Sequence, residues 1–293
     1  MAILLAFTDT KAGRDALKLA VIMARSLHTT IHAVTVVVNR PSVTVPPDAK
    51  YNKLVTRQSG KWLKKAVSQI PVEVKTHVRR ANSPAAGLLA AIDEFSPSFL
   101  VIAGGRHGAT GKVSLGSVGQ TLLNASPVPV ALAPRGYRKR TDVRAITEVT
   151  VGADKRPGNA NLMKFAIAIA KEAAAPLRLL SLIAVDKRGK ISELEKEARS
   201  HIDAVYSTAV KELGKKYPIE RSVVKGTSVE KATASVKWDL GGIALLGSSS
   251  LAFPKRAFMG NVANHILREL PVPLVVVPKD GDMDAIISEY CND

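Results

Sequence analysis

The hydrophobic and polar positions in the first half of the chain alternate between two patterns. Five short runs of apolar or β-branched residues are typical of strands buried in a sheet: residues 3–7, 31–38, 72–78, 99–103 and 128–133. Four stretches between these runs repeat their apolar side chains at helical spacing: residues 13–27, 50–68, 83–95 and 117–125. Ser83 and Pro84 suit a helix start, with serine as the capping residue and proline in the first turn. Strands and helices are therefore expected in strict alternation.

The second half repeats this order. Its expected strands are residues 149–153, 177–184, 219–224, 243–246 and 274–277. Its expected helices are residues 159–174, 191–213, 229–235 and 262–270. Continuous apolar strands that alternate with helices predict an α/β fold, in which each half is a doubly wound parallel sheet with helices on both faces. In such sheets a ligand binds beyond the carboxyl ends of the strands, where the strand order reverses.

A repeated segment indicates that the two halves are copies of one module. The segment PVPVALAP at residues 127–134 returns as PVPLVVVP at residues 271–278, an offset of 144 residues, and Gly116-Ser117 precedes the first as Gly260-Asn261 precedes the second. A unit of this length is a whole domain rather than a solenoid repeat. We expect a first domain over residues 1–138, a second over 142–280, and a loosely held acidic tail over 281–293. The basic linker, residues 135–141, is expected to be flexible.

Positive charge is concentrated in the first half. The net charge is +17, of which residues 1–141 contribute +14 and residues 142–293 contribute +3. This asymmetry favours an anionic partner for the first half, with a solvated basic surface as the alternative. Only 4% of the residues are aromatic, and no RNA-binding motif or helix-turn-helix supports nucleic-acid binding. The chain has no apolar run as long as a membrane span, no signal peptide and a single cysteine, so a cytoplasmic location is expected.

A glycine-rich segment follows the fourth predicted strand of each copy. In the first copy it runs from Gly105 through Gly108 to Gly116, and a helix is expected to begin at Ser117. Glycine lets backbone amides approach an anion, and a helix N-terminus adds partial positive charge. The segment therefore suits a nucleotide phosphate, with a glycine-rich turn that binds nothing as the alternative.

Several competing signatures are absent. A Walker A loop would need a glycine and a hydroxyl residue where Arg106 and Val113 stand. A Rossmann fingerprint would need glycines in the turn after the first strand, at residues 8–10. His28 and His32 straddle a helix end and a strand, so no shared metal is expected. The chain shows no nucleophile elbow, cysteine–histidine pair or acid/base carboxylate pair, and thus no catalytic machinery.

With these motifs, each half resembles a domain of the universal stress protein (UspA) family. The family pattern is G-x2-G-x9-G-[S/T] after the fourth strand, followed by a final strand of the form P-x-P-hydrophobic. The resemblance covers residues 1–136 and 144–279. It implies a five-stranded parallel sheet of order 3-2-1-4-5 in each half and self-association through the last strands. Some members bind ATP at this loop and others do not.

Both copies depart from the ATP-binding pattern. In the first, the spacer 109–115 has seven residues instead of nine, and Thr8 occupies the position of the family's aspartate. In the second, Ser250 and Asn261 replace a glycine and a hydroxyl residue. The resemblance implies these candidate cofactor-binding residues: Thr8, Asp9, Gly105, His107, Gly108, Gly116 and Ser117 in the first copy, and Asp154, Gly247, Ser250, Gly260 and Asn261 in the second. Candidate phosphate partners are Lys112, Lys255 and Arg256.

The leading hypothesis is a cytoplasmic tandem universal stress protein that binds ATP or AMP at a degenerate glycine loop. Magnesium is expected only with bound ATP, and enzymatic activity is not expected beyond weak ATP hydrolysis. The alternative is a structural or interaction protein with silent nucleotide sites and a basic surface for an anionic partner. A third reading, an ATP-hydrolysing or adenylate-transferring enzyme, is disfavoured because neither residues 8–10 nor 154–156 match an SGGxDS-type loop.

Overall fold

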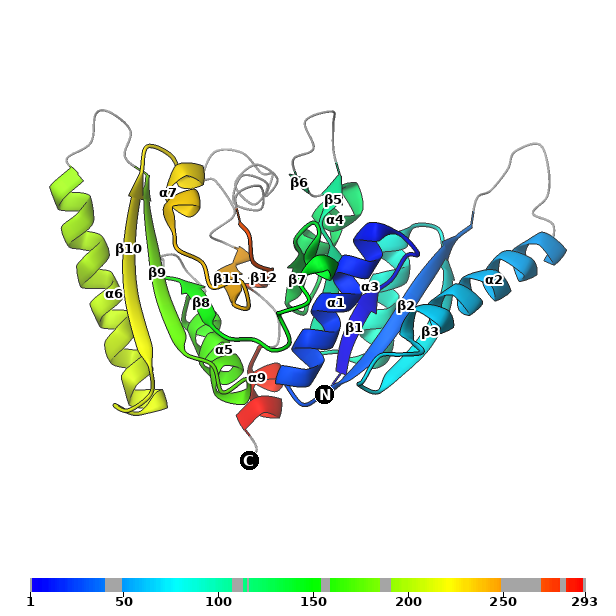
Figure 1. Cartoon of the computed structure of the whole chain (residues 1–293), viewed down its shortest axis with the longest axis horizontal. Coiled ribbons are helices and arrows are strands. Elements are labelled where there is room, and N and C mark those ends of the chain that lie inside the picture. Colours follow the sequence, from blue (N-terminus) through cyan, green and yellow to red (C-terminus); the bar gives the residue numbers. More distant parts are fainter. Residues whose placement is uncertain are drawn as a thin grey trace.

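Ten strands form one continuous sheet in the computed structural model (Figure 1). The structure describes residues 2–39, 49–106, 113–114, 116–153, 159–184, 191–248, 270–279 and 283–291. Helices cover both faces of the sheet (Figure 1). The predicted α/β architecture is confirmed, and the two expected sheets are joined into one.

The first half forms one end of this sheet. Its five parallel strands are β1 (Ala2–Ala6), β2 (Thr30–Val38), β3 (Val74–Ala81), β4 (Phe99–Ala103) and β7 (Val130–Ala133). Their spatial order is β3-β2-β1-β4-β7, which is the expected 3-2-1-4-5 arrangement. The helices of this half are α1 (Lys11–Ser26), α2 (Ala49–Val67), α3 (Pro84–Phe95) and α4 (Ser117–Ala125).

The second half has the same topology. Its parallel strands are β8 (Val149–Gly152), β9 (Leu177–Ala184), β10 (Ile219–Gly226), β11 (Ile243–Gly247) and β12 (Leu274–Val277). They lie in the order β10-β9-β8-β11-β12. The described helices are α5 (Asn159–Glu172), α6 (Ile191–Leu213) and α7 (Val229–Ser235). The helix expected over residues 262–270 lies outside the described residues, apart from its last position.

The last strands of the two halves join the sheet at its centre. β12 pairs with β7 in antiparallel register, with Val275 opposite Ala131, and both residues are fully buried. These are the strands that the sequence assigned to self-association between chains. In this structure they pair within one chain, so both of their edges are already hydrogen-bonded, and the exposed edges of the sheet are β3 and β10.

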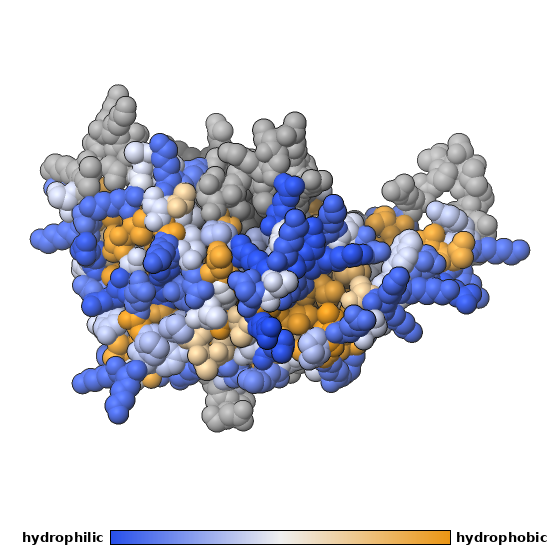
Figure 2. Space-filling view, viewed as in Figure 1, coloured by the Kyte–Doolittle hydropathy of each residue, from blue (hydrophilic) through white to orange (hydrophobic). Residues whose placement is uncertain are grey.

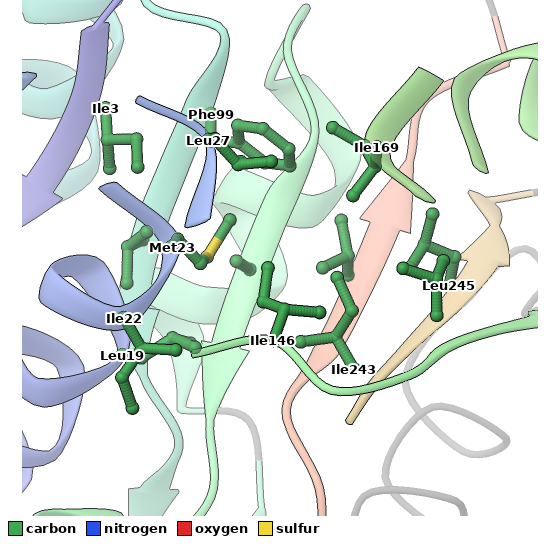
Figure 3. Close-up of a cluster of buried hydrophobic side chains, with 14 of the residues drawn as sticks. Ile3, Leu19, Ile22, Met23, Leu27, Phe99, Ile146, Ile169, Ile243 and Leu245 are labelled. Atoms are coloured by element: carbon green, nitrogen blue, oxygen red, sulfur yellow. The ribbon is translucent and has the colours of Figure 1, made fainter. Parts of the chain in front are cut away.

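One hydrophobic cluster continues from the first half into the second. Its buried members come from α1, β1 and β4 on one side and from α5, β8 and β11 on the other. Figure 3 shows part of it, with Met23 and Phe99 from the first half and Ile243 and Leu245 from the second. The rings of Phe99 and Phe165 lie 5.3 Å apart between centroids, which joins the two halves directly. The halves therefore share a core as well as a sheet.

The linker between the halves is ordered, contrary to the expectation of a flexible segment. It contains a short 3-10 helix, η1 (Tyr137–Lys139), and the Tyr137 side chain is fully buried. Arg140 donates hydrogen bonds to the carbonyl oxygens of Leu240 and Pro271 in the second half. The basic composition of the linker suggested that it is exposed to solvent, but the Arg140 side chain is bound to these two carbonyl groups.

The acidic tail also differs from its expectation. Residues Met283–Cys291 form helix α9, which packs against α5 beneath the sheet (Figure 1). Ile286 and Ile287 contact the core and Tyr290 is buried. Because these three apolar side chains fall on one side of a helical turn, the segment has a hydrophobic face that its acidic composition conceals.

Candidate functional site

The turn between β1 and α1 lies at the carboxyl end of the sheet. Phe7 continues the strand by donating its amide to the Val34 carbonyl at 2.8 Å, and its own carbonyl accepts a bond from the Thr35 hydroxyl at 3.1 Å. The Phe7 side chain is buried, whereas Thr8 and Asp9 are exposed. The chain thus leaves the core at Thr8 and presents polar side chains to solvent.

Helix α1 begins with a side-chain cap inside this turn. The Thr10 hydroxyl accepts the Gly13 amide at 3.0 Å, and it lies 3.1 Å from the Thr8 hydroxyl. Gly13 packs directly on the turn, because a Cβ at this position would lie only 1.9 Å from the Thr8 carbonyl oxygen. A glycine is therefore required where the helix folds back over the strand end.

Asp9 forms an exposed ion pair with Arg14. Oδ1 of Asp9 lies 3.0 Å from Nη2 of Arg14. Arg14 is on the first turn of α1, and Asp9 precedes that helix. The Thr8 hydroxyl, in the position of the expected aspartate, lies instead against Thr10. The turn therefore offers two neighbouring hydroxyls and one carboxylate already paired with an arginine.

The glycine-rich segment of the first half begins as a small hairpin. Gly105–Arg106 (β5) pairs in antiparallel fashion with Val113–Ser114 (β6), where the sequence predicted a loop. Gly116 follows as the N-cap of α4, and none of the described side chains caps this helix end. A Cβ on Gly116 would meet no described atom within 4 Å, and its φ of −65° needs no glycine. Within the described part of the chain, nothing occupies the space beside Gly116 at the start of α4.

The sheet brings the two segments together. β1 and β4 are neighbours, with Leu5 opposite Val101, so in the same register Phe7 lies beside Ala103. The turn at Thr8 and the glycine segment at Gly105 therefore leave the sheet at adjacent strand ends. The order of the strands reverses here, since β2 lies on one side of β1 and β4 on the other. His107, Gly108 and Lys112 lie outside the described residues.

In the second half, the described residues cover little of the corresponding site. Gly247 ends β11 beside Val277, and the hydroxyl of the next residue, Ser248, accepts the Lys279 amide at 3.1 Å. The other candidates of this half, Asp154, Ser250, Lys255, Arg256, Gly260 and Asn261, lie outside the described residues.

Asp15 is an acidic residue whose contacts the sequence analysis did not predict. It is nearly fully buried on α1, and its carboxylate accepts the amides of Gly136 and Arg138, both at 2.9 Å. Beside it, burial raises the pKa of the Tyr137 hydroxyl to about 12. The sequence feature that could have indicated these contacts is an acidic residue within the apolar stretch of α1. The Asp15 carboxylate binds the linker between the two halves.

His32 of β2 with His77 and Arg79 of β3 forms a second polar cluster, on the side of the sheet that α3 covers. His32 and His77 stack with ring centroids 5.1 Å apart, and the Phe95 ring contacts both. Burial lowers the pKa of each histidine. Both arginines of β3 have partners, because Arg79 binds Glu94 and Arg80 binds Asn39.

Two kinds of site receive no support from the described residues. Within them, no group of three or more His, Cys, Asp or Glu side chains could hold a metal ion. Among the helices that the structure describes, none combines the length and the apolar character that crossing a membrane requires.

Known proteins resemble this chain over nearly its whole length. The model of the Universal stress protein family matches residues 1–134 and 146–278. Universal stress protein Rv2319c of Mycobacterium tuberculosis is 29% identical over 297 residues, covering 95% of this chain and 100% of that protein. A universal stress protein structure from Archaeoglobus fulgidus has a TM-score of 0.63 at 15% identity, covering 95% of this chain and 98% of that one. The functionally unknown protein PA1789 of Pseudomonas aeruginosa has a TM-score of 0.61 at 16% identity, covering 100% and 97%.

Proposed function

Because the chain belongs to the universal stress protein family and carries its domain twice, we propose that it binds an adenine nucleotide through its first half. The proposed site lies between the β1–α1 turn and the glycine segment, at the carboxyl ends of β1 and β4. The observation that carries the proposal is the placement of these two segments at adjacent strand ends, where the strand order reverses. ATP and AMP are the nucleotides that we propose to test first.

The start of α4 suits a phosphate group. Its first amides have no acceptor within the helix, none of the described side chains caps them, and a Cβ on Gly116 would meet no described atom within 4 Å. The exposed hydroxyl of Thr8 and the carboxylate of Asp9 follow the neighbouring strand β1 and are the candidates to bind the sugar. Magnesium would be needed only with ATP, because the neighbouring phosphates of ATP would themselves supply oxygen ligands to the ion.

The second half is a poorer candidate. Ser250 and Asn261 replace the glycine and the hydroxyl residue of the family pattern, so we assign the nucleotide to the first half. The protein would then act as a cytoplasmic stress-response module that responds to the nucleotide and does not turn it over. Its basic first half would provide a surface for an anionic partner.

Isothermal titration with ATP and with AMP tests the nucleotide. We expect binding to the full chain, and weaker binding to Gly116→Ser, which puts a side chain where a phosphate would approach. This change leaves folding intact, because the N-cap position favours serine. Gly60→Ser is the matched control, since that glycine lies on α2 and its Cβ would meet only Val78, at 3.5 Å. Absence of binding heat with both nucleotides would leave the interaction protein with silent sites as the better reading.

The anionic partner has its own test. The first half contributes +14 of the net charge, so the protein should be retained on a sulfated polyanion resin and released by salt. Passage of the protein through such a resin at low salt would reject a general anionic partner.

A further inference from the structure

Helix α2 carries an unusual set of exposed apolar side chains. Among the described residues, six large hydrophobic side chains are exposed, and three of them are on this helix: Tyr51, Leu54 and Trp62, with 64%, 62% and 49% exposure. Eleven residues separate Tyr51 from Trp62, which is close to three helical turns, so the two project in nearly the same direction. Leu63 and Ser59 are buried, and the helix packs against β2 and β3.

The same helix is entirely basic. Residues 49–67 contain six Lys or Arg and no acidic residue, and Figure 2 shows hydrophilic side chains gathered over α2 at the end of the sheet. Its counterpart in the second half, α6, has three basic and five acidic residues, a net charge of −2 against +6. This one pair of helices therefore accounts for most of the charge difference between the halves.

The two helices also differ in how many of their charged side chains form ion pairs. On α6, Glu195 pairs with Arg199 and Lys225, and Asp203 pairs with Arg221. On α2, by contrast, Arg57, Lys61, Lys64 and Lys65 make no ion pair with any described part of the chain. A row of unneutralised cations beside exposed Trp, Tyr and Leu is costly to keep in water and indicates a partner that is both anionic and apolar.

We propose that the outer face of α2 docks the protein on an anionic lipid surface. This deepens the anionic-partner proposal and rests on it. Trp and Tyr prefer the level of the lipid headgroups, Leu54 can enter the acyl boundary, and lysine can hold its amine at the phosphates while its stem lies along apolar groups. Helix α2 lies at one end of the ten-stranded sheet, where it packs on β2 and β3 (Figure 1).

Nucleic acid fits this face less well. The cations of the helix do not separate the two partners, because lysine and arginine bind the phosphates of nucleic acids and of lipids alike. Base stacking would use the two aromatic rings but gives Leu54, at 62% exposure, no contact that favours it. A lipid surface uses all three apolar side chains and the lysines together.

Sedimentation with vesicles tests the proposal on the full chain. We expect binding to phosphatidylcholine vesicles that contain phosphatidylglycerol, little binding to phosphatidylcholine alone, and release by salt. The double variant Lys61→Glu with Lys65→Glu should bind about tenfold or more weakly, since each cation near an anionic surface contributes about 1 kcal/mol. The matched control, Lys211→Glu with Lys215→Glu, changes the same number of exposed charges in the second half and should bind almost as the native protein does.

Trp62 supplies a second measurement on the same samples. Its emission, taken as the difference between the native protein and Trp62→Phe, should shift to shorter wavelength on the anionic vesicles. Equal losses in the two charge variants, or an unshifted Trp62 spectrum, would overturn the proposal. Retention on the polyanion resin without vesicle binding would keep the anionic partner and reject the lipid. If the protein is neither retained on the resin nor bound to anionic vesicles, both the anionic-partner proposal and the lipid proposal are rejected.

Discussion

Asp15 on α1 holds Arg138 of the linker in a nearly buried ion pair. Nη1 of the guanidinium lies 2.9 Å from Oδ1 and 3.1 Å from Oδ2, and the Asp15 side chain is only 4% exposed. The same carboxylate accepts two backbone amides from the linker. Since α1 starts at the proposed nucleotide site, one helix connects that site to the junction of the two halves.

Removal of the Asp15 carboxylate should destabilise the protein strongly. In Asp15→Ala, two part-buried amides lose their acceptor and Arg138 loses its counter-charge, so we expect the free energy of unfolding to fall by about 3 kcal/mol. Urea denaturation measures this loss. Trypsin should also cut the variant faster at the linker, because Arg138, Lys139 and Arg140 are then less firmly held.

The matched control for this change is Asp203→Ala. Its carboxylate pairs with Arg221 on the surface, where both side chains are about half exposed, and its loss should cost less than about 1 kcal/mol. Similar losses in the two variants would show that the Asp15 contacts do not fix the linker.

The stacked histidines predict how stability depends on pH. Burial lowers the pKa of His32 and His77 below 6.5, so the unfolded chain binds protons more strongly than the folded one. The free energy of unfolding should therefore fall as the pH drops below 6.5, and it should continue to fall until the folded histidines protonate. Lys75 and Arg79 face the pair and add to the cost of the charged forms.

The double variant His32→Phe with His77→Phe should flatten this dependence. Chemical denaturation at a series of pH values measures it, and the range should stay above pH 4.5, because the Arg79 hydrogen bond lowers the pKa of Glu94 and that pair is lost only at lower pH. An unchanged slope in the variant would assign the acid sensitivity to other groups.

Gly13 should tolerate no larger residue. An alanine Cβ would lie 1.9 Å from the Thr8 carbonyl oxygen and 3.0 Å from the Thr8 amide nitrogen, which are backbone atoms that cannot move aside cheaply. Gly13→Ala should cost about 2 kcal/mol or more and should weaken nucleotide binding by displacing the turn. Thermal unfolding and titration measure the two effects.

Gly60→Ala provides the comparison for Gly13. Its Cβ would meet only Val78, at 3.5 Å, and alanine favours a helix interior, so stability should rise by about 0.5 kcal/mol. A neutral result for Gly13→Ala would mean that the β1–α1 turn is looser than the structure indicates.

The shared sheet and core predict cooperative unfolding of the whole chain. β7 and β12 are buried and paired with each other, and Phe99 contacts Phe165 across the junction. Calorimetry should therefore show a single transition whose calorimetric and van't Hoff enthalpies agree. Two separate transitions would show that the halves unfold independently.

Local pattern was sufficient for most elements of the fold. Alternating strand and helix periods and the repeated PVP segments indicated two doubly wound halves, and the resemblance supplied their strand order. The closeness of the two turns at the proposed nucleotide site was also predictable, because the topology of a parallel sheet decides which turns are neighbours. Thr8 and Gly105 follow from this rule without knowledge of any side-chain contact.

Tertiary structure alone decided how the copies are joined. A last strand that ends in buried valines can pair with any similar edge, so periodicity cannot say whether Val275 pairs within the chain or with another molecule. Asp15 and Arg138 are 123 residues apart, and their attraction depends on a burial that no local window shows. Composition made the linker and the tail look solvated, whereas long-range contacts bury Tyr137 and Tyr290. Sequence therefore determined the two modules, and packing between distant segments determined that they form one body.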